Sequence, residues 1–367
     1  MKIIVSAFSN LYTDQRIEKV CRTLQENGYT LELIGNNWKN DALVERPYPV
    51  KKIALSSKQL RKAYVEFNYK LYKELLSKAD AQTILHANDL DALLPNYLVS
   101  KKLGIPLIYD SHEIFTEMPA IKGRWTQKVW QGLERYLMPR VKYMMTESES
   151  YAKWFDKQYH IKPLVIRNIP RKIPKDDISI PNNQPKVVLY QGAINQSRGL
   201  DKAIKAMHYL ENVVFKIAGD GPKRQEYENL ATTEGLNDKV LFLGNQAPDN
   251  LRALTKTADV GLSVEENGGV SYLYSLPNKV GDYIQSRVPL VMINFPEMKR
   301  VYEQHKVGEL ITSHEPKIIA EAVKKVLHNG RAYYQNALEQ AASDLCWEND
   351  ETKILNLYQK VIKENFY

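Results

Sequence analysis

Residues 275–279 read Ser-Leu-Pro-Asn-Lys, followed by Asp282-Tyr283 and the apolar run Pro289-Leu290-Val291. This order predicts a loop, then a helix with Lys279 and Asp282 near its start, then a short buried strand. The amides and the cation of such a helix start suit phosphate oxygens, and a nearby carboxylate suits ribose hydroxyls. An ordinary helix cap has the same composition, because Asp and Asn are common near helix starts. The loop by itself leaves both interpretations open.

Length and composition predict a globular protein of two domains. The 367 residues exceed what one typical core holds, and 44% of them are apolar. No apolar run approaches the roughly 18 residues of a membrane span. The start MKIIVSAFSN is typical of a first strand rather than a signal peptide, because charged residues follow it closely. Cys21 and Cys346 stand far apart, which favours a reducing cytosol and excludes a disulfide scaffold or a cysteine zinc site.

The net charge of +8 lies in the first half of the chain. Residues 1–170 carry 26 Lys and Arg against 18 Asp and Glu, whereas residues 171–367 carry 25 of each. This asymmetry predicts a polyanionic partner of the N-terminal half: an anionic membrane surface, a phosphorylated acceptor or nucleic acid. We expect no nucleic acid, because the chain holds no recognised nucleic-acid motif and its second half is neutral.

Strand-like apolar runs alternate with helical patterns, which predicts parallel sheets flanked by helices. The Pro-rich stretch 170–185 interrupts the alternation and has the composition of a linker. We therefore expect an N-terminal Rossmann-like domain at 1–169, a second one at 186–335, and a helical segment at 336–367 that packs back toward the first. The expected strands are 3–7, 31–35, 83–86, 107–110, 143–146, 164–166, 187–190, 213–218, 240–243, 260–263 and 289–293.

Polar residues end several of these strands. His86 to Asp89 follow the third, Asp110 to Glu113 the fourth, and Glu147 to Ser150 the fifth. The carboxyl ends of parallel strands face the ligand crevice of such a sheet. His112 is therefore either a site residue or a structural histidine, and its polar neighbours do not separate the two.

Two turns of the second half favour phosphate binding. Residues 192–199 follow its first strand, where Gly192 lets the backbone approach a ligand and Arg198 can contact phosphate oxygens with two donors. Gly219 lies in a sharp turn after the next strand, where Asp220 fits a simple turn residue. The chain holds neither the eight-residue phosphate loop of nucleoside triphosphatases nor a G-x-G-x-x-G fingerprint.

Taken in order, these segments resemble a known family. "LYQGAINQSRGLDKAIKAM", "VVFKIAGDGP", "VLFLGNQAPDNLRAL", "ADVGLSV", "SLPNKVGDYIQSRVPLV" and "PEMKRVYEQHKVGELI" are similar to the C-terminal domain of retaining GT-B glycosyltransferases of family 4. "TDQRIEKVCRTLQENGYTLELI", "DSHEIFTEMP" and "VIRNIP" are similar to their N-terminal domain. The resemblance covers essentially the whole chain. It implies an α/β GT-B fold, with two Rossmann-like doubly wound parallel-sheet domains that face a central cleft.

The resemblance also implies an activity. Family members transfer a sugar from a nucleoside-diphosphate-sugar to a saccharide or lipid-linked acceptor, with retention of the anomer and without a metal, often in cell-surface polysaccharide synthesis. We expect the same here, with no cofactor. The one Asp-x-Asp triplet, Asp89-Leu90-Asp91, is expected at a helix start rather than on a metal.

The resemblance assigns roles to individual residues. The expected catalytic residues are His112, Arg198 and Lys279. The expected donor-binding residues are Gly192, Arg198, Gly219, Ser275, Leu276, Pro277, Asn278, Lys279 and Asp282. On the acceptor side we expect Asp14, Arg16, His86, Asp89 and Glu113.

The chain departs from the family pattern at four places. Tyr274 stands where the family has a glutamate that contacts the donor sugar, and Glu265 or Glu266 either replaces it or is a solvated loop charge. Ala193 stands where a basic residue is usual, and Lys279 is the candidate for the missing charge. Asp282 replaces the longer glutamate that binds the ribose. Residues 9–16 replace the glycine-rich first loop.

Two segments suit a membrane interface. Residues 58–78 and 121–142 are amphipathic, aromatic and basic, which fits either an interfacial helix or an exposed basic helix packed on a sheet. The sequence therefore predicts a cytoplasmic protein, and peripheral association with the inner face of the plasma membrane is a hypothesis. Two rival functions remain, a GT-B nucleotide-sugar epimerase and a donor-binding subunit with weakened catalysis.

Overall fold

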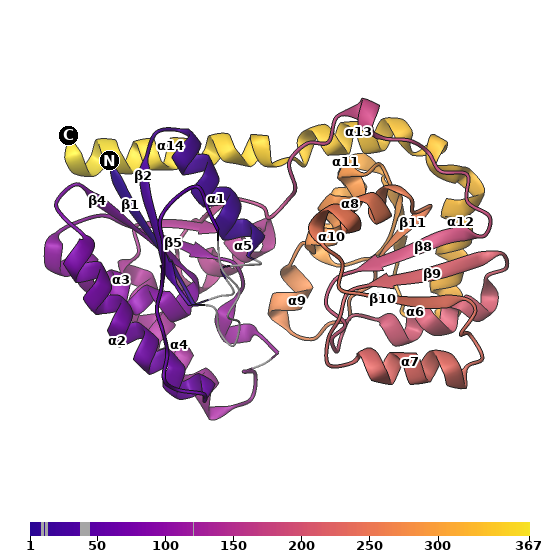
Figure 1. Cartoon of the computed structure of the whole chain (residues 1–367), viewed down its shortest axis with the longest axis horizontal. Helices are drawn as coiled ribbons and strands as arrows, with labels where there is room; N and C mark the ends of the chain where they lie inside the picture. The colour runs from indigo at the N-terminus through magenta and orange to yellow at the C-terminus, as the bar shows by residue number, and fades with distance from the viewer. Residues whose placement is uncertain (9–10, 12–13, 37–44, 120) are drawn as a thin grey trace. The chain divides into compact units, whose positions relative to one another are not determined.

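Two parallel β-sheets, one in each of two units, organise the chain (Figure 1). The computed structural model describes residues 1–8, 11, 14–36, 45–119 and 121–367. Unit 1 comprises Met1–Asn168 and Asp350–Tyr367, and unit 2 comprises Ile169–Asn349. The prediction of two doubly wound, Rossmann-like parallel sheets is confirmed. A cleft between them stays a prediction.

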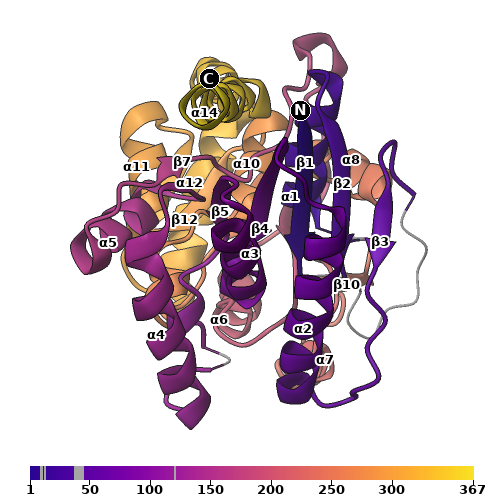
Figure 2. The same ribbon diagram turned by 90° about the vertical axis from the view of Figure 1, so that its left-hand side faces the viewer.

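The described residues of unit 1 form a seven-stranded sheet in the order β3-β2-β1-β4-β5-β6-β7. Its strands are β1 (Lys2–Ala7), β2 (Thr30–Gly35), β3 (Val50–Lys52), β4 (Thr83–Asn88), β5 (Leu107–Ser111), β6 (Tyr143–Thr146) and β7 (Leu164–Val165). Its helices are α1 (Gln15–Glu26), α2 (Leu60–Lys78), α3 (Asp89–Leu103), α4 (Trp125–Leu137) and α5 (Glu149–Tyr159), with 3₁₀ turns η1 (Phe115–Glu117) and η2 (Met138–Arg140). Figure 2 shows α3 between α2 and α4.

Local signals in the sequence fix the start of two helices in unit 1. The Asp14 carboxylate accepts a hydrogen bond from the amide of Ile17 at 3.0 Å and caps α1. The Ser148 hydroxyl accepts one from the amide of Tyr151 at 3.1 Å and caps α5. Each cap satisfies an amide that the helix itself leaves unpaired, so α1 begins after Asp14 and α5 begins after Ser148.

The described residues of unit 2 form a six-stranded sheet in the order β10-β9-β8-β11-β12-β13. Its strands are β8 (Lys186–Gln191), β9 (Val213–Ala218), β10 (Val240–Gly244), β11 (Val260–Ser263), β12 (Leu290–Ile293) and β13 (Gly308–Ile311). Its helices are α6 (Leu200–Ala206), α7 (Arg224–Thr233), α8 (Pro248–Lys256), α9 (Val270–Tyr274), α10 (Asn278–Gln285), α11 (Pro296–His305), α12 (Pro316–Tyr333) and α13 (Gln335–Asp344), with 3₁₀ turns η3 (Lys175–Asp177) and η4 (Met207–Tyr209).

Helix α10 is held against the sheet by the apolar residues between its charged ones. Val280, Tyr283 and Ile284 are fully buried, and the Tyr283 hydroxyl donates to the carbonyl of Leu189 in β8 at 2.9 Å. This packing fixes the rotation of the helix about its axis. The loop, helix and strand predicted from residues 275–291 are therefore present in unit 2.

Two short strands were not predicted from the sequence. β3 has the sequence Val-Lys-Lys and pairs with β2 in the register Leu33↔Val50. β13 pairs with β12 in the register Leu290↔Gly308. Both lie at sheet edges, where pairing with a neighbour rather than an apolar pattern makes the strand.

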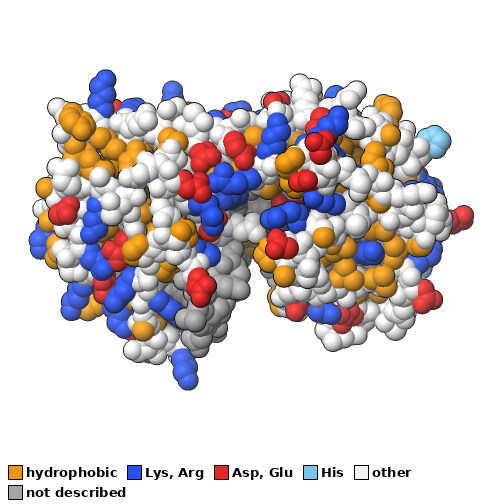
Figure 3. Space-filling view, turned by 45° about the horizontal axis from the view of Figure 1, so that its top comes forward, with side chains coloured by type: hydrophobic (Ala, Val, Ile, Leu, Met, Phe, Trp, Pro, Cys, Tyr) orange, Lys and Arg blue, Asp and Glu red, His pale blue; other side chains and the backbone are white. Residues whose placement is uncertain are grey.

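The segments expected to join or follow the domains belong partly to unit 2. Residues 170–185 are counted with unit 2, where the amide of Ile173 donates to the Gln285 side chain at 3.0 Å. Helix α13 also lies in unit 2, whereas α14 (Trp347–Phe366) lies in unit 1 from Asp350 onward. No described helix is both long enough and apolar enough to cross a bilayer. Lys, Arg, Asp and Glu side chains lie among hydrophobic ones on the face of the molecule that Figure 3 presents.

Helix α14 is anchored in unit 1 by Asp350. This residue is fully buried and accepts hydrogen bonds from the Arg167 amide at 2.7 Å and from its guanidinium at 3.0 and 3.1 Å. Ile354, Tyr358 and Val361 continue the contact as a fully buried apolar stripe. The returning helix is thus part of the core of unit 1.

We expect Asp350→Ala to lower the free energy of unfolding by about 3 kcal/mol, because it leaves a largely buried guanidinium and amide without their acceptor. Urea unfolding followed by circular dichroism measures this loss. Glu74→Ala breaks the exposed pair Lys51–Glu74, whose atoms lie 3.9 Å apart, and should cost less than about 1 kcal/mol. Equal effects of the two substitutions would contradict the anchor.

Candidate functional site

The turns that follow β8 and β9 in unit 2 touch backbone to backbone. A Cβ at Gly219, where φ is +147°, would lie 1.9 Å from the carbonyl oxygen of Gly192. Only glycine permits this approach. Gly192 itself is exposed, and a Cβ there would lie 3.6 Å from the Lys279 side chain. The structure therefore brings the predicted donor residues Gly192, Gly219 and Lys279 together.

Arg198 lies in the turn before α6 and keeps an unused donor. Its guanidinium lies 4.8 Å from the centre of the Tyr272 ring, and its Nε is buried without a hydrogen-bond partner among the described residues. Gly199 fixes the turn, because a Cβ there would lie 2.1 Å from the carbonyl oxygen of Val264. A buried donor without an acceptor is costly, so the position suits an anion supplied by a ligand.

Lys279 lies in the first turn of α10 and is paired with Glu265. The two side chains are 7% and 2% exposed, and the ammonium also lies 4.1 Å from the centre of the Tyr190 ring. Burial by itself would raise the pKa of Glu265, but the Lys279 charge and hydrogen bonds from Lys279 and Ser263 lower it below its usual value. The interpretation of Glu265 as a solvated loop charge is wrong.

The pairing of Lys279 with Glu265 changes the balance of charge. The charge of Arg198 also lowers the pKa of Glu265, so this carboxylate interacts with both predicted catalytic cations. Lys279 brings no net positive charge to the loop while Glu265 is ionised beside it. The expectation that Lys279 supplies the charge missing at Ala193 stays a prediction.

Asp282 lies one turn beyond Lys279 on α10 and is half-buried. Its carboxylate accepts a hydrogen bond from the Gln191 amide group at 2.7 Å, and Gln191 in turn accepts from the Thr255 hydroxyl at 2.7 Å. This chain of contacts orients the carboxylate. The contact of Asp282 with a ribose stays a prediction.

The loop before α10 carries the other predicted donor residues. Leu276 is buried, Ser275 and Pro277 are half-buried, and Asn278 is exposed. No side chain caps α10 at Pro277, so its first amides, which form the positive end of the helix dipole, have no side-chain acceptor at the cap position. Tyr274 ends α9, and its correspondence to the glutamate of the family pattern stays a prediction.

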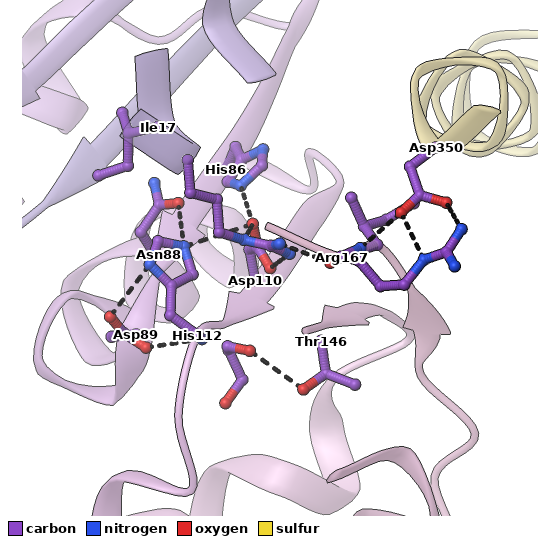
Figure 4. A network of polar contacts seen from close by, with 12 residues as sticks. Ile17, His86, Asn88, Asp89, Asp110, His112, Thr146, Arg167 and Asp350 are labelled. Carbon is purple, nitrogen blue, oxygen red and sulfur yellow. Dashed lines mark hydrogen bonds and ion pairs between the residues drawn. The ribbon is translucent and has the colours of Figure 1, made fainter. Parts of the chain in front are cut away.

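In unit 1, Arg16 and Asp110 form a buried pair at the strand ends. Both are at most 1% exposed, and Arg16 donates to the two carboxylate oxygens at 2.6 and 3.0 Å and to the carbonyl of Ile166 at 2.5 Å. Figure 4 shows the polar contacts around Asp110 and, beside them, the pair of Arg167 and Asp350. The pair of Arg16 and Asp110 is closed to solvent, so the structure gives Arg16 a supporting role behind Asp110 rather than the expected acceptor contact.

His112 stands between two carboxylates at the end of β5. Its Nε2 lies 3.4 Å from Asp110 Oδ2, and its Nδ1 lies 3.6 Å from Asp89 Oδ2. Its amide donates to Asp89 at 2.9 Å, and Asp89 has a φ of +57°, which is uncommon for a residue other than glycine. Burial by itself would lower the pKa of His112, but the charges of Asp89 and Asp110 raise it to about 10. The imidazole is therefore a cation at neutral pH.

His86 is fully buried below the same network. Its Nδ1 lies 2.5 Å from the Tyr358 hydroxyl of α14, and its Nε2 lies 3.9 Å from Asp110 Oδ2. Burial lowers the pKa of His86 to about 4, so the ring is neutral at pH 7. The expected contact of His86 with an acceptor does not fit this burial. Of the remaining acceptor-side candidates, Asp14 caps α1 and Glu113 is exposed.

Glu147 belongs to the same cluster and was missed as a site residue. It follows β6, next to β5 in the sheet, and is half-buried. Burial raises its pKa to about 7, although Arg16 and His112 lower it. Its position at a strand end is the signal by which the sequence analysis could have found it. Among the described residues no group of three His, Cys, Asp or Glu is placed to hold a metal ion.

We expect neither His86 nor His112 to titrate between pH 5.5 and 8.5. Because folding raises the pKa of His112, the protonated imidazole stabilises the folded protein fully below about pH 6.5. This stabilisation is lost as the pH rises toward 10. NMR titration of the imidazole Cε1 protons, assigned with His86→Gln and His112→Gln, tests this. A His112 midpoint near 6.5 would refute the assigned charge.

Two family models match consecutive parts of the chain. Residues 15–176 match Glycosyltransferase Family 4, and residues 172–344 match Glycosyl transferases group 1. A putative colanic acid biosynthesis glycosyl transferase of Escherichia coli, WcaI, is 32% identical over 108 residues, which are 29% of this chain and 26% of the relative. The chain spans about half the length, or less, of the first curated relatives it matches.

Solved structures match over nearly the whole chain. Sucrose-phosphate synthase from Thermosynechococcus elongatus has a TM-score of 0.82 at 14% identity and covers 99% of this chain and 100% of its own. The Anabaena protein HepE, in complex with UDP and glucose, has a TM-score of 0.75 at 17% identity and covers 98% and 100%. At these identities the likeness shows the fold. The two family models, which together match residues 15–344, support a glycosyltransferase of the group 1 and family 4 type.

Proposed function

We propose that the protein transfers a sugar from a nucleoside-diphosphate-sugar donor to a saccharide or lipid-linked acceptor, without a metal and with retention of the anomer. The observation that carries the proposal is the buried Nε of Arg198, which has no acceptor among the described residues and lies in the unit that holds the uncapped start of α10. A donor diphosphate supplies the missing acceptor. HepE, which shares the fold, binds UDP and glucose.

The chemistry follows from where charge develops. As the bond between the sugar and the diphosphate stretches, negative charge builds on the phosphate oxygens. Arg198, Lys279 and the first amides of α10 then act more strongly on the transition state than on the ground state. Because Glu265 already neutralises Lys279, Arg198 and the amides supply most of this stabilisation. Asp282, oriented by Gln191, holds the ribose.

We place the reaction in cell-surface polysaccharide synthesis at the inner face of the plasma membrane. The relative WcaI is named for colanic acid biosynthesis, which supports this setting. His112 and its carboxylates form the acceptor side. A donor-binding subunit with weakened catalysis is the second candidate, because Tyr274 stands in place of the glutamate that the family pattern uses for the donor sugar. A measured transfer of sugar to an acceptor would distinguish the proposed activity from such a subunit and from an epimerase.

We expect Arg198→Ala and Asp282→Ala each to abolish sugar transfer, and Arg198→Ala to weaken binding of a nucleoside diphosphate by about tenfold or more, since it removes a charge-assisted hydrogen bond. A thermal-shift panel of nucleoside diphosphates and their sugars measures binding, and release of diphosphate in the presence of acceptor measures turnover. Arg252→Ala, at an arginine that is 59% exposed on α8 of the same unit, is the matched control. Wild-type rates in Arg198→Ala and Asp282→Ala would refute the site.

The membrane association rests on α2 and α4. Ala63, Phe67, Leu71 and Leu75 bury one face of α2, while Val65 and Tyr69 remain 72% and 60% exposed. On α4, Trp125 is 62% exposed and carries the Arg61 guanidinium 5.0 Å from its ring centre. Apolar and basic side chains together suit an anionic lipid surface.

We expect the protein to float with vesicles of phosphatidylcholine and phosphatidylglycerol at about 0.15 M salt and to be released at high salt, since the attraction is partly electrostatic. The double variant Trp125→Ser and Lys128→Glu should float less. Tyr333→Ser, at a residue 71% exposed on unit 2, is the control and should float like the wild type. A wild-type protein that stays unbound at moderate salt rules out the association.

A further inference from the structure

The strand ends of unit 1 hold more carboxylates than cations. Arg16 pairs with Asp110, and His112 lies between Asp89 and Asp110. These two cations are thus engaged within the cluster. The acidic residues there whose charges raise the pKa of a neighbour, or whose own pKa is raised by one, are Asp14, Asp89, Asp91, Asp110, Glu113 and Glu147.

Two of these carboxylates have unmet hydrogen-bonding capacity. Asp91 is 5% exposed, and its Oδ1 has no partner within the described parts of the chain. Burial and the charge of Asp89 raise the pKa of Asp91 well above its usual value, and the charge of His112 lowers it. The half-buried carboxylate of Glu147 makes no hydrogen bond or ion pair with the described residues. A carboxyl group that is withdrawn from water without a hydrogen-bond donor costs free energy, which indicates that a ligand supplies the donor.

The surroundings of Glu147 set its charge. Arg16 faces it from α1, Asp110 from β5, and His112 and Glu113 from the turn after β5. Burial and the two acidic neighbours raise its pKa to about 7, while the two cations lower it. His112 stays protonated over the same range. The site therefore becomes more negative between pH 6 and pH 8.

We propose that the sugar which enters this site carries no acidic group, and that Glu147 recognises it by accepting a hydrogen bond from a hydroxyl or ammonium group. A phosphate or carboxylate here would meet several carboxylates and no uncommitted cation among the described residues, whereas a hydroxyl or ammonium group finds an acceptor at Glu147, which is half-buried at the end of β6. The proposal rests on the proposed function, because it identifies the acceptor side of that site.

Matched sugars test the proposal. The probes are the methyl glycosides of glucose, galactose and mannose with their 2-amino and uronic acid forms, and saturation-transfer NMR of the full chain measures binding at pH 6 and pH 8. At pH 8 we expect neutral or amino forms to bind about tenfold more tightly than uronides, as a hydrogen bond to a charged group implies. The preference should shrink at pH 6, where Glu147 is mostly protonated.

Glu147→Gln should reduce this preference to a few-fold at both pH values. Glu149→Gln, at an exposed carboxylate two residues along in the first turn of α5, is the matched control and should keep the wild-type preference. The pKa of Glu147 is raised on folding, so its ionised form destabilises the protein as the pH rises toward 7 and above. Glu147→Gln should therefore raise the melting temperature at pH 8 but not at pH 5.

The outcomes separate this proposal from the proposed function. Uronides that bind as tightly as neutral sugars, no binding by any neutral or amino probe, or wild-type selectivity in Glu147→Gln would each overturn the proposal. Binding of nucleoside diphosphates and its loss in Arg198→Ala are measured on the same samples. If no nucleoside diphosphate binds, the proposed function fails; if it binds and the sugars fail to discriminate, only the acceptor inference fails.

Discussion

The buried pair of Arg16 and Asp110 is the contact on which unit 1 depends. It joins α1 to β5, and through the carbonyl of Ile166 it reaches the strand end that leads to Arg167 and the returning helix α14. The Asp110 charge, held by Arg16, also keeps His112 protonated. A buried ion pair of this kind contributes little net stability but is costly to break, so it fixes one arrangement of the strand ends.

Unit 2 also contains a buried ion pair, and there the pair lies next to the predicted donor residues. Lys279 and Glu265 pair below the surface, and Gln191 orients Asp282, so the charged groups of α10 are held in place before any ligand arrives. Arg198 differs from them because its buried Nε has no hydrogen-bond acceptor among the described residues. Such preorganised but unmatched groups lower stability and favour binding, which is the usual balance at functional sites.

Unit 1 separates its charges in space. Its excess of Lys and Arg is counted over the whole N-terminal half, whereas the strand ends gather carboxylates around His112 and Glu147. A count along the chain therefore predicts an anionic partner, and the local geometry predicts a non-acidic sugar. The two agree if the basic surface of α2 and α4 meets the membrane while the strand ends meet the acceptor.

The sequence by itself determined the two parallel sheets, most of their strands, and the loop and helix at residues 275–285, because apolar period and turn residues are local signals. It named Arg198, Lys279, Asp282 and His112 through the order of its motifs. Only the tertiary structure decided that Glu265 neutralises Lys279, that His86 and Arg16 are closed to solvent, and that Glu147 joins His112. Burial and charge pairing arise between residues far apart in the chain, so no local pattern encodes them.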